Sequence, residues 1–246
     1  MNNTITEIRN VFINSKDRLS GDENEFFYNL RNAILNPNAV ALESVQIYNT
    51  QYTINDNNNK LYWTSSVPTN ITTTLTNGNY TATTLASHIA SKLNTDNDGA
   101  GTFAVTCPTS TAKMTITNDT ANFGLRFATT AQSVAYTIGF EDTNKTGALT
   151  YTAENIVSLN TKYYLIYCDI GSTNTHSATE TSNVIAVVPC NVNFSDLISY
   201  SPQLAKSFKF KIQELSRMKF TVRDDRGNLA DLNGVDWCMN LVVSIK

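Results

Sequence analysis

Four carboxylates lie close together near the end of the chain, in "DDRGNLADLNGVD": Asp224, Asp225, Asp231 and Asp236. Carboxylates at this density could bind a divalent cation or serve as an acid and a base. A calcium loop needs oxygen ligands at alternating positions and a bidentate Glu near its end. Here Arg226 and Leu229 occupy ligand positions, and the stretch contains no Glu. The residue types therefore argue against a metal site.

The same stretch contains two turn signatures. Gly227 follows Asp225 and Arg226, and glycine can supply the positive φ of a hairpin tip. A second turn is predicted at residues 231–234, just before the final apolar stretch. Because Asp side chains accept hydrogen bonds from the backbone N–H groups of turns, we predict that these carboxylates are structural.

Catalysis has little support elsewhere in the sequence. A Ser or Cys nucleophile needs a His and an orienting acid, but only His88 and His176 are present and there is no G-x-S-x-G motif. Neither a Walker loop nor G-x-G-x-x-G occurs. A glycosidase needs only two carboxylates at a set separation. By composition alone, the candidates for that role are Glu141, Asp142, Asp169 and Asp196. We predict that the protein is not an enzyme and has no catalytic, cofactor-binding or metal-binding residues.

The composition is that of a folded protein, with 41% hydrophobic and 16% charged residues. The formal net charge is −3 and no block of Lys and Arg is present, so we expect no direct binding to nucleic acid. No stretch approaches the ~20 apolar residues of a membrane span, and "MNNTITEIRN" lacks the features of a signal peptide. These absences predict a soluble protein made in a reducing compartment. No C-x-x-C spacing occurs, so neither a zinc site nor a disulfide framework is predicted, and we expect buried, reduced thiols. These cysteines are Cys107, Cys168, Cys190 and Cys238.

Abundant Asn and Thr favour many strands joined by tight turns. Strands are predicted within residues 11–18, 24–34, 39–54, 61–66, 101–107, 112–117, 123–128, 135–140, 162–170, 183–190, 217–224 and 237–246. In 39–54 we expect Val45 and Ile47 to face inward, and a break in the alternation indicates a β-bulge. The apolar stretches 162–170 and 183–190 are typical of central strands buried on both faces or beneath a helix.

The remaining long stretches differ in pattern. Residues 144–160 read as a connection, and residues 199–210 as a loop or edge segment. One helix is predicted, in "TATTLASHIASKLN" (residues 81–94), where Leu85, Ile89 and Leu93 recur every four residues. Thr81 or Thr83 can cap its start. We expect its apolar stripe to lie across the end or edge of a sheet, and His88, beside the stripe, to be partly buried and hydrogen-bonded.

These elements predict an all-β protein, mainly β with one short helix, folded as an antiparallel β-sandwich in a single jelly roll. No motif repeats at a fixed period, so one domain is favoured over two tandem domains. We predict an N-terminal arm or first strand at residues 1–21 and a single jelly-roll domain at residues 22–246.

Several segments, in order, resemble the single-jelly-roll penton and related minor capsid proteins of virophages and nucleo-cytoplasmic large DNA viruses. The most specific are "GNYTATTLASHIASKLN", the "IGF" at Ile138 to Phe140, and "LSRMKFTVRDDRGNLADLNGVDWCMNLVVSI" at the end. The resemblance covers nearly the whole chain. Some penton relatives carry a large inserted outer domain, and no boundary for one is visible in the sequence.

The resemblance implies a structural capsid protein made in the host cytoplasm and located at the capsid vertex of the virion. Five copies would form a homo-pentamer at the icosahedral fivefold. Its partners would be trimers of a double-jelly-roll major capsid protein and other minor capsid proteins. The N-terminal arm and the exposed turns would supply the contacts.

Two alternatives stay open at this stage. The helix followed by short strands and "IGF" also resembles phage structural proteins, so a host-attachment or carbohydrate-binding virion or tail-associated β module is the second hypothesis. Such a module would expose aromatic rings, for which Trp63 and Tyr62 are candidates, although packing in the core is favoured for both. A hydrolase would need two carboxylates converging in a cleft.

Overall fold

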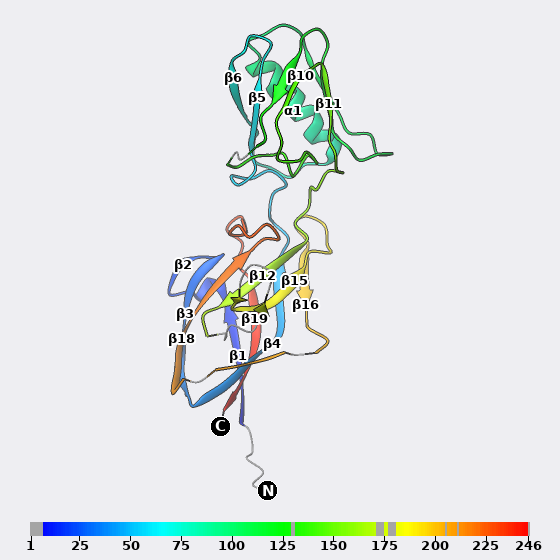
Figure 1. The fold of residues 1–246 in the computed structure, drawn as a ribbon. Coiled ribbons are helices and arrows are strands. Elements are labelled where there is room, and N and C mark those ends of the chain that lie inside the picture. Colours follow the sequence, from blue (N-terminus) through cyan, green and yellow to red (C-terminus); the bar gives the residue numbers. More distant parts are fainter. Residues whose placement is uncertain are drawn as a thin grey trace. The chain divides into compact units, whose positions relative to one another are not determined.

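The computed structural model describes residues 7–128, 131–170, 175–176, 181–204, 206–210 and 212–245 (Figure 1). The chain divides into two compact units, Met1–Gln51 with Thr161–Lys246, and Tyr52–Asn160. The second unit is inserted into the first, which differs from the single domain predicted over residues 22–246. Threonine accounts for 25 of the 109 residues of this inserted segment but for only 9 of the other 137, so a change in composition does mark the boundary, and the search for repeated motifs did not detect it. We call the two units the jelly-roll unit and the inserted unit.

The jelly-roll unit contains eight principal strands: β1 (Glu7–Asn14), β3 (Glu25–Leu35), β4 (Pro37–Tyr48), β12 (Tyr163–Cys168), β15 (Val184–Pro189), β16 (Leu197–Tyr200), β18 (Glu214–Arg223) and β19 (Cys238–Ile245). One sheet has the order β1-β19-β4-β16, and the other has the order β15-β12-β18-β3. Numbered one to eight along the chain, these orders are 1-8-3-6 and 5-4-7-2, the two interleaved Greek keys of a jelly roll. The predicted fold class is therefore confirmed.

Shorter elements complete this unit. They are the 3-10 turn η1 (Ser15–Asp17), β2 (Ser20–Asp22) at the edge beside β3, β17 (Ser207–Lys209) paired with β4, and the hairpin of β13 (Thr175–His176) and β14 (Thr181–Ser182). Within the segment predicted as an arm or first strand, residues 7–14 form β1, which pairs with β19 along its whole length. Residues 1–6 lie outside the described part of the chain.

The two sheets enclose one apolar core. Alternate residues of each strand point into it, as with Val11 and Ile13 of β1. Phe26 lies near its centre, with its ring centroid 5.5 Å from that of Phe220 and 5.9 Å from that of Trp237. Because burying one large apolar side chain contributes about 1.5–3 kcal/mol, this shared core is the main stabilising term of the unit.

The predicted bulge lies in β4 at Glu43. Asn240 of β19 is opposite Ser44, and the next residue, Leu241, is opposite Leu42, so Glu43 is the extra residue. The bulge shifts the alternation of β4 by one residue. Even-numbered residues such as Leu42 face inward before it, and odd-numbered residues such as Val45 face inward after it. It leaves Glu43 exposed.

The apolar stretches 162–170 and 183–190 are not both central strands. β12 lies between β15 and β18, and its burial alternates, whereas β15 forms the edge of the sheet. The predicted helix does not cover them, because it belongs to the inserted unit. Their continuous apolar character instead leaves half-buried and exposed apolar residues on the outer side of this sheet, among them Leu165 and Val187.

The inserted unit has two small antiparallel sheets and one helix. One sheet contains β5 (Lys60–Thr64), β6 (Asn70–Thr74), β9 (Phe123–Leu125) and β10 (Lys145–Ala148), and the other contains β7 (Phe103–Thr106), β8 (Thr115–Asn118) and β11 (Thr150–Thr152). Helix α1 (Ala82–Asp96) buries Leu85, Ile89 and Leu93 in a core separate from that of the jelly roll. The predicted helix and its apolar stripe are confirmed.

A capping box fixes the start of α1. The Thr81 hydroxyl accepts a hydrogen bond from the Thr84 backbone N–H at 3.2 Å, and the Thr84 hydroxyl accepts one from the Thr81 N–H at 2.9 Å. These bonds provide acceptors for two backbone N–H groups at the start of the helix, where no preceding turn supplies a carbonyl acceptor. Thr81 is therefore the N-cap, one of the two residues predicted for that role.

Two predictions in this unit are wrong. Residues 135–140 form consecutive turns in place of a strand, with the Phe140 N–H bonded to the Ala135 carbonyl at 2.9 Å. Gly139 has a φ of +86°, and a Cβ at this position would lie 2.3 Å from the Asn155 carbonyl oxygen. The chain turns there against another backbone segment, which the apolar sequence alone does not indicate. The supposed connection 144–160 contains the short strands β10 and β11.

Candidate assembly surfaces

The closing carboxylates are parts of turns, as predicted. Asp224 is only 2% exposed. Its Oδ1 atom accepts hydrogen bonds from the backbone N–H groups of Arg226 and Asn228, both at 2.9 Å, and its Oδ2 atom accepts one from Nε2 of Gln51 at 3.0 Å. Gly227, at the tip, has a φ of +83°. Oδ1 therefore holds the turn, and Oδ2 joins the turn to Gln51.

In the second turn one carboxylate is used in the same way, and Asp236 has a different role. Asp231 Oδ1 accepts a hydrogen bond from the Asn233 N–H at 3.0 Å. Asp236 Oδ1 accepts one from the Ser15 hydroxyl at 2.7 Å and another from the Arg18 guanidinium at 2.9 Å. Asp236 therefore joins the last connection of the jelly roll to its first.

The carboxylates considered for glycoside hydrolysis are divided between the two units. Glu141 and Asp142 belong to the inserted unit, whereas Asp169 and Asp196 belong to the jelly-roll unit. Asp169 Oδ1 accepts a hydrogen bond from the Lys219 backbone N–H at 2.8 Å. Within the described ranges, no group of three or more His, Cys, Asp and Glu side chains is arranged to hold a metal ion.

His88 has the structural role predicted for it. Its Nε2 atom accepts a hydrogen bond from the Thr76 backbone N–H at 3.0 Å, and its ring stacks on Tyr80 with centroids 5.2 Å apart. Burial and the nearby Lys92 ammonium lower the pKa of His88. The ring is therefore neutral at pH 7 and acts as a hydrogen-bond acceptor. The side chain of His176 lies outside the described residues.

The aromatic pair considered for carbohydrate binding is mostly used in packing. Trp63 is fully buried, and its Nε1 atom donates a hydrogen bond to the Thr73 hydroxyl at 3.0 Å. Tyr62 is half-buried and donates from its hydroxyl to the Ala131 carbonyl at 2.9 Å. The Trp63 ring is therefore not available to stack on a sugar.

No disulfide links the four cysteines, all of which lie in the described part of the chain. Cys168 is buried, and the other three are half-buried, so the prediction of full burial is correct for Cys168 alone. Burial, and to a smaller extent the charge of Asp225, raises the pKa of Cys190 to about 12. Its thiol is therefore protonated and unreactive at neutral pH.

The outer side of sheet β1-β19-β4-β16 exposes large apolar side chains. Because Val11 and Ile13 face inward, the alternate residues Ile8 and Phe12 face outward, and they are 61% and 56% exposed. Tyr48 and Leu197 are cross-strand partners on the same side, each 41% exposed. We call this surface the β4 face.

The outer side of β3 and β18 has a different chemistry. The Arg217 guanidinium lies over the Phe27 ring, 3.9 Å from its centroid. Beside it, the Lys219 ammonium forms an ion pair with Glu25 at 2.7 Å, and this hydrogen bond and charge lower the pKa of Glu25 despite partial burial. We call this surface the β18 face. Sequence patterns missed both faces, because they depend on which strands pair.

The similarity of this chain to known proteins lies in its structure. No protein-family model and no curated protein matches the chain. The structure is similar to the crystal structure of the selenomethionine-labelled mavirus penton protein, with 10% sequence identity and a TM-score of 0.49, over 96% of this chain and 100% of that one. In the described residues, no helix is both long and apolar enough to cross a membrane.

Proposed function

We propose that this protein is a structural capsid protein, a penton capsomer that forms a pentamer at the icosahedral fivefold of a virion and contacts neighbouring major capsid proteins. The observation that carries the proposal is the eight-strand jelly roll with a separately cored unit inserted between its third and fourth strands. That architecture agrees with the penton-like order of segments in the sequence. The protein would act by assembly and would turn over no substrate.

The distribution of polar groups supports a structural role. Asp224 and Asp231 hold turns, and His88 accepts a backbone hydrogen bond. The Cys190 thiol is protonated at neutral pH. By contrast, apolar side chains are exposed on the outside of a sheet, where a monomer gains nothing from them. A protein that assembles would cover such a surface with a partner.

A ring of identical subunits needs an interface between two different surfaces of the subunit, with a rotation that closes after five copies. Each contact can be weak, because a subunit in a closed ring is held on two sides and in a shell by further neighbours. In the virion, these neighbours would be trimers of the double-jelly-roll major capsid protein and other minor capsid proteins. Synthesis would take place in the host cytoplasm.

Native mass spectrometry of the full chain, at increasing concentrations, tests the ring directly. We expect a five-subunit species alone or with the major capsid protein, and density for this chain at the fivefold vertices of a particle reconstruction. A strict monomer under all these conditions, together with vertices occupied by another protein, would contradict the proposal.

A further inference from the structure

We propose that neighbouring subunits of this ring contact each other through the β4 face of one copy and the β18 face of the next, with Glu43 of the first bound to Arg217 of the second. This inference rests on the proposed penton function and names the surfaces that would build the ring. It follows from the charge of the two faces, their exposed apolar groups and their positions on the sandwich.

The β4 face is depleted of charge at its centre. Strands β4, β19 and β16 together contain a single formally charged residue, Glu43. In β1, Glu7 and Arg9 form an ion pair with each other, and the short β17 adds Lys209. Free protein surfaces carry about 25–35% charged residues, whereas the buried centres of interfaces are depleted of them. The composition of this face is therefore that of an interface centre.

Glu43 itself is displayed by the bulge. It is the extra residue of β4, so it has no cross-strand neighbour in β19, and its side chain is exposed. The neighbouring outward residues form an uncharged ladder, in which the Asn240 amide donates to the Ser44 hydroxyl at 3.2 Å. Within the described residues Glu43 has no ion-pair partner. A carboxylate on a mostly apolar and amide surface favours a cationic partner.

The β18 face supplies that partner. Strands β3 and β18 contain four cationic residues and two acidic ones, an excess of two positive charges: Arg31, Arg217, Lys219 and Arg223 against Glu25 and Glu214. Lys219 is paired with Glu25, and Arg223 donates to the Gly227 carbonyl at 2.6 Å. Arg217 is exposed and lies on Phe27, and no carboxylate in the described part of the chain pairs with it.

The geometry of Arg217 suits recognition of a carboxylate. A guanidinium that lies over an aromatic ring keeps its N–H groups in its own plane and directed away from the ring, where they can bind a carboxylate in a two-bond fork. The ring fixes the guanidinium before binding, so less conformational entropy is lost when Glu43 binds. Phe27, which is half-buried, would provide apolar area beside this pair, as Phe12 does on the other face.

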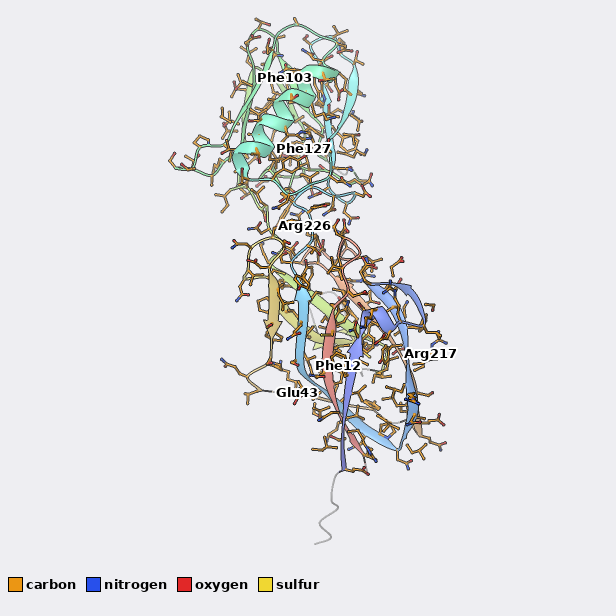
Figure 2. The ribbon with its side chains drawn as sticks, turned by 180° about the vertical axis from the view of Figure 1, so that it is seen from behind. Phe12, Glu43, Phe103, Phe127, Arg217 and Arg226 are labelled. Atoms are coloured by element: carbon orange, nitrogen blue, oxygen red, sulfur yellow. The ribbon has the colours of Figure 1, made fainter. Side chains whose placement is uncertain are left out.

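The two faces also have the positions that a ring requires. β4 and β18 belong to opposite sheets of the sandwich, and Figure 2 shows Glu43 and Arg217 on opposite sides of the jelly-roll unit. One copy can therefore present its β4 face to one neighbour and its β18 face to the other. Other occupants of the β4 face, such as the major capsid protein, are outcomes that the following experiment separates.

The experiment is a charge exchange in the full-length protein. We expect Glu43→Arg and Arg217→Glu each to raise the concentration needed for half-maximal ring formation by about tenfold or more, because each places like charges opposite each other. The double variant Glu43→Arg/Arg217→Glu restores the pair in reverse, so we expect it to recover most of the ring. Asp98→Arg, an equal charge change at an exposed position of the inserted unit, is the matched control and leaves the ring unchanged.

The outcomes distinguish this interface from the function on which it rests. If the wild-type protein forms the ring and neither single variant weakens it, or if the double variant is no better than the singles, the Glu43–Arg217 interface is wrong and the penton proposal stands. If the wild-type protein forms no ring under any condition, both proposals fail. Thermal unfolding of each variant checks that the fold is unchanged, and recovery in the double variant could not come from misfolded protein.

Discussion

The side-chain amide of Gln51 donates a hydrogen bond to the buried carboxylate of Asp224, with 3.0 Å between Nε2 and Oδ2. Gln51 is the last residue of the jelly-roll unit before the chain enters the inserted unit, and Asp224 begins the turn between β18 and β19. This bond therefore fixes the exit of the chain to a turn 173 residues further along. Asp224, one of a group of carboxylates that could suggest chemistry, therefore has a structural role in the jelly-roll unit.

Replacing Asp224 is expected to destabilise the jelly-roll unit. Asp224→Ala removes the acceptor for two backbone N–H groups and for Gln51 in a site that is 2% exposed. Buried donors left without a partner cost about 1–3 kcal/mol. Urea titration of the free energy of unfolding measures the effect. Asp225→Ala is the matched control, since this neighbouring carboxylate is more exposed, and its effect should stay within about 0.5 kcal/mol. Equal losses in the two variants would contradict the anchoring role.

The two units are expected to unfold separately, because each has its own core. Ile89→Ala removes a fully buried side chain of the inserted unit and should destabilise that unit by about 2–5 kcal/mol. Val45→Ala, in β4, should act on the jelly-roll unit alone. Calorimetry of the full chain should show one transition that moves in each variant while the other stays in place. A single transition that moves equally in both variants would show that the units unfold together.

The capping box of α1 gives a prediction for helix stability. Thr81→Ala removes the hydroxyl that accepts from the Thr84 N–H, and loss of such a cap costs about 1 kcal/mol. Thr83→Ala, two residues further into the helix and exposed, should have little effect or be slightly stabilising, since Ala has the higher helix propensity. Hydrogen exchange of the first-turn amides measures the difference. Equal exchange in both variants would show that the cap contributes nothing.

Stability should also depend on pH through His88. Its pKa is lower in the folded protein than the ordinary value of 6.5, so the unfolded chain binds a proton first as the pH falls. His88 therefore makes the free energy of unfolding decrease as the pH is lowered through and below 6.5. His88→Gln keeps a hydrogen-bond acceptor but does not titrate in this range, so its stability should change less between pH 7 and pH 5 than that of the wild type. An equal slope in the two proteins would contradict this assignment.

Local features of the fold follow from the sequence. The positive φ of Gly227 and Gly234, the N-cap at Thr81 and the buried stripe of α1 depend on residues that are close together in the chain. The same is true of the bulge at Glu43, which leaves its mark in the alternation of β4 itself. Turn chemistry and short-range periodicity predict these features from nearby residues, without information on distant parts of the chain.

The tertiary structure decided what depends on distant residues. The pairing of β1 with β19 joins segments near the two ends of the chain, which no local pattern relates. Residues 135–140 are apolar enough for a strand, but they turn because the Asn155 backbone lies against Gly139. The exposure of Phe12 and the position of Arg217 over Phe27 were likewise fixed by strand order. Alternation of apolar and polar residues with a period of two shows only that alternate side chains lie on the same side of a strand. The packing of one sheet on the other determines which side is buried and which side stays exposed.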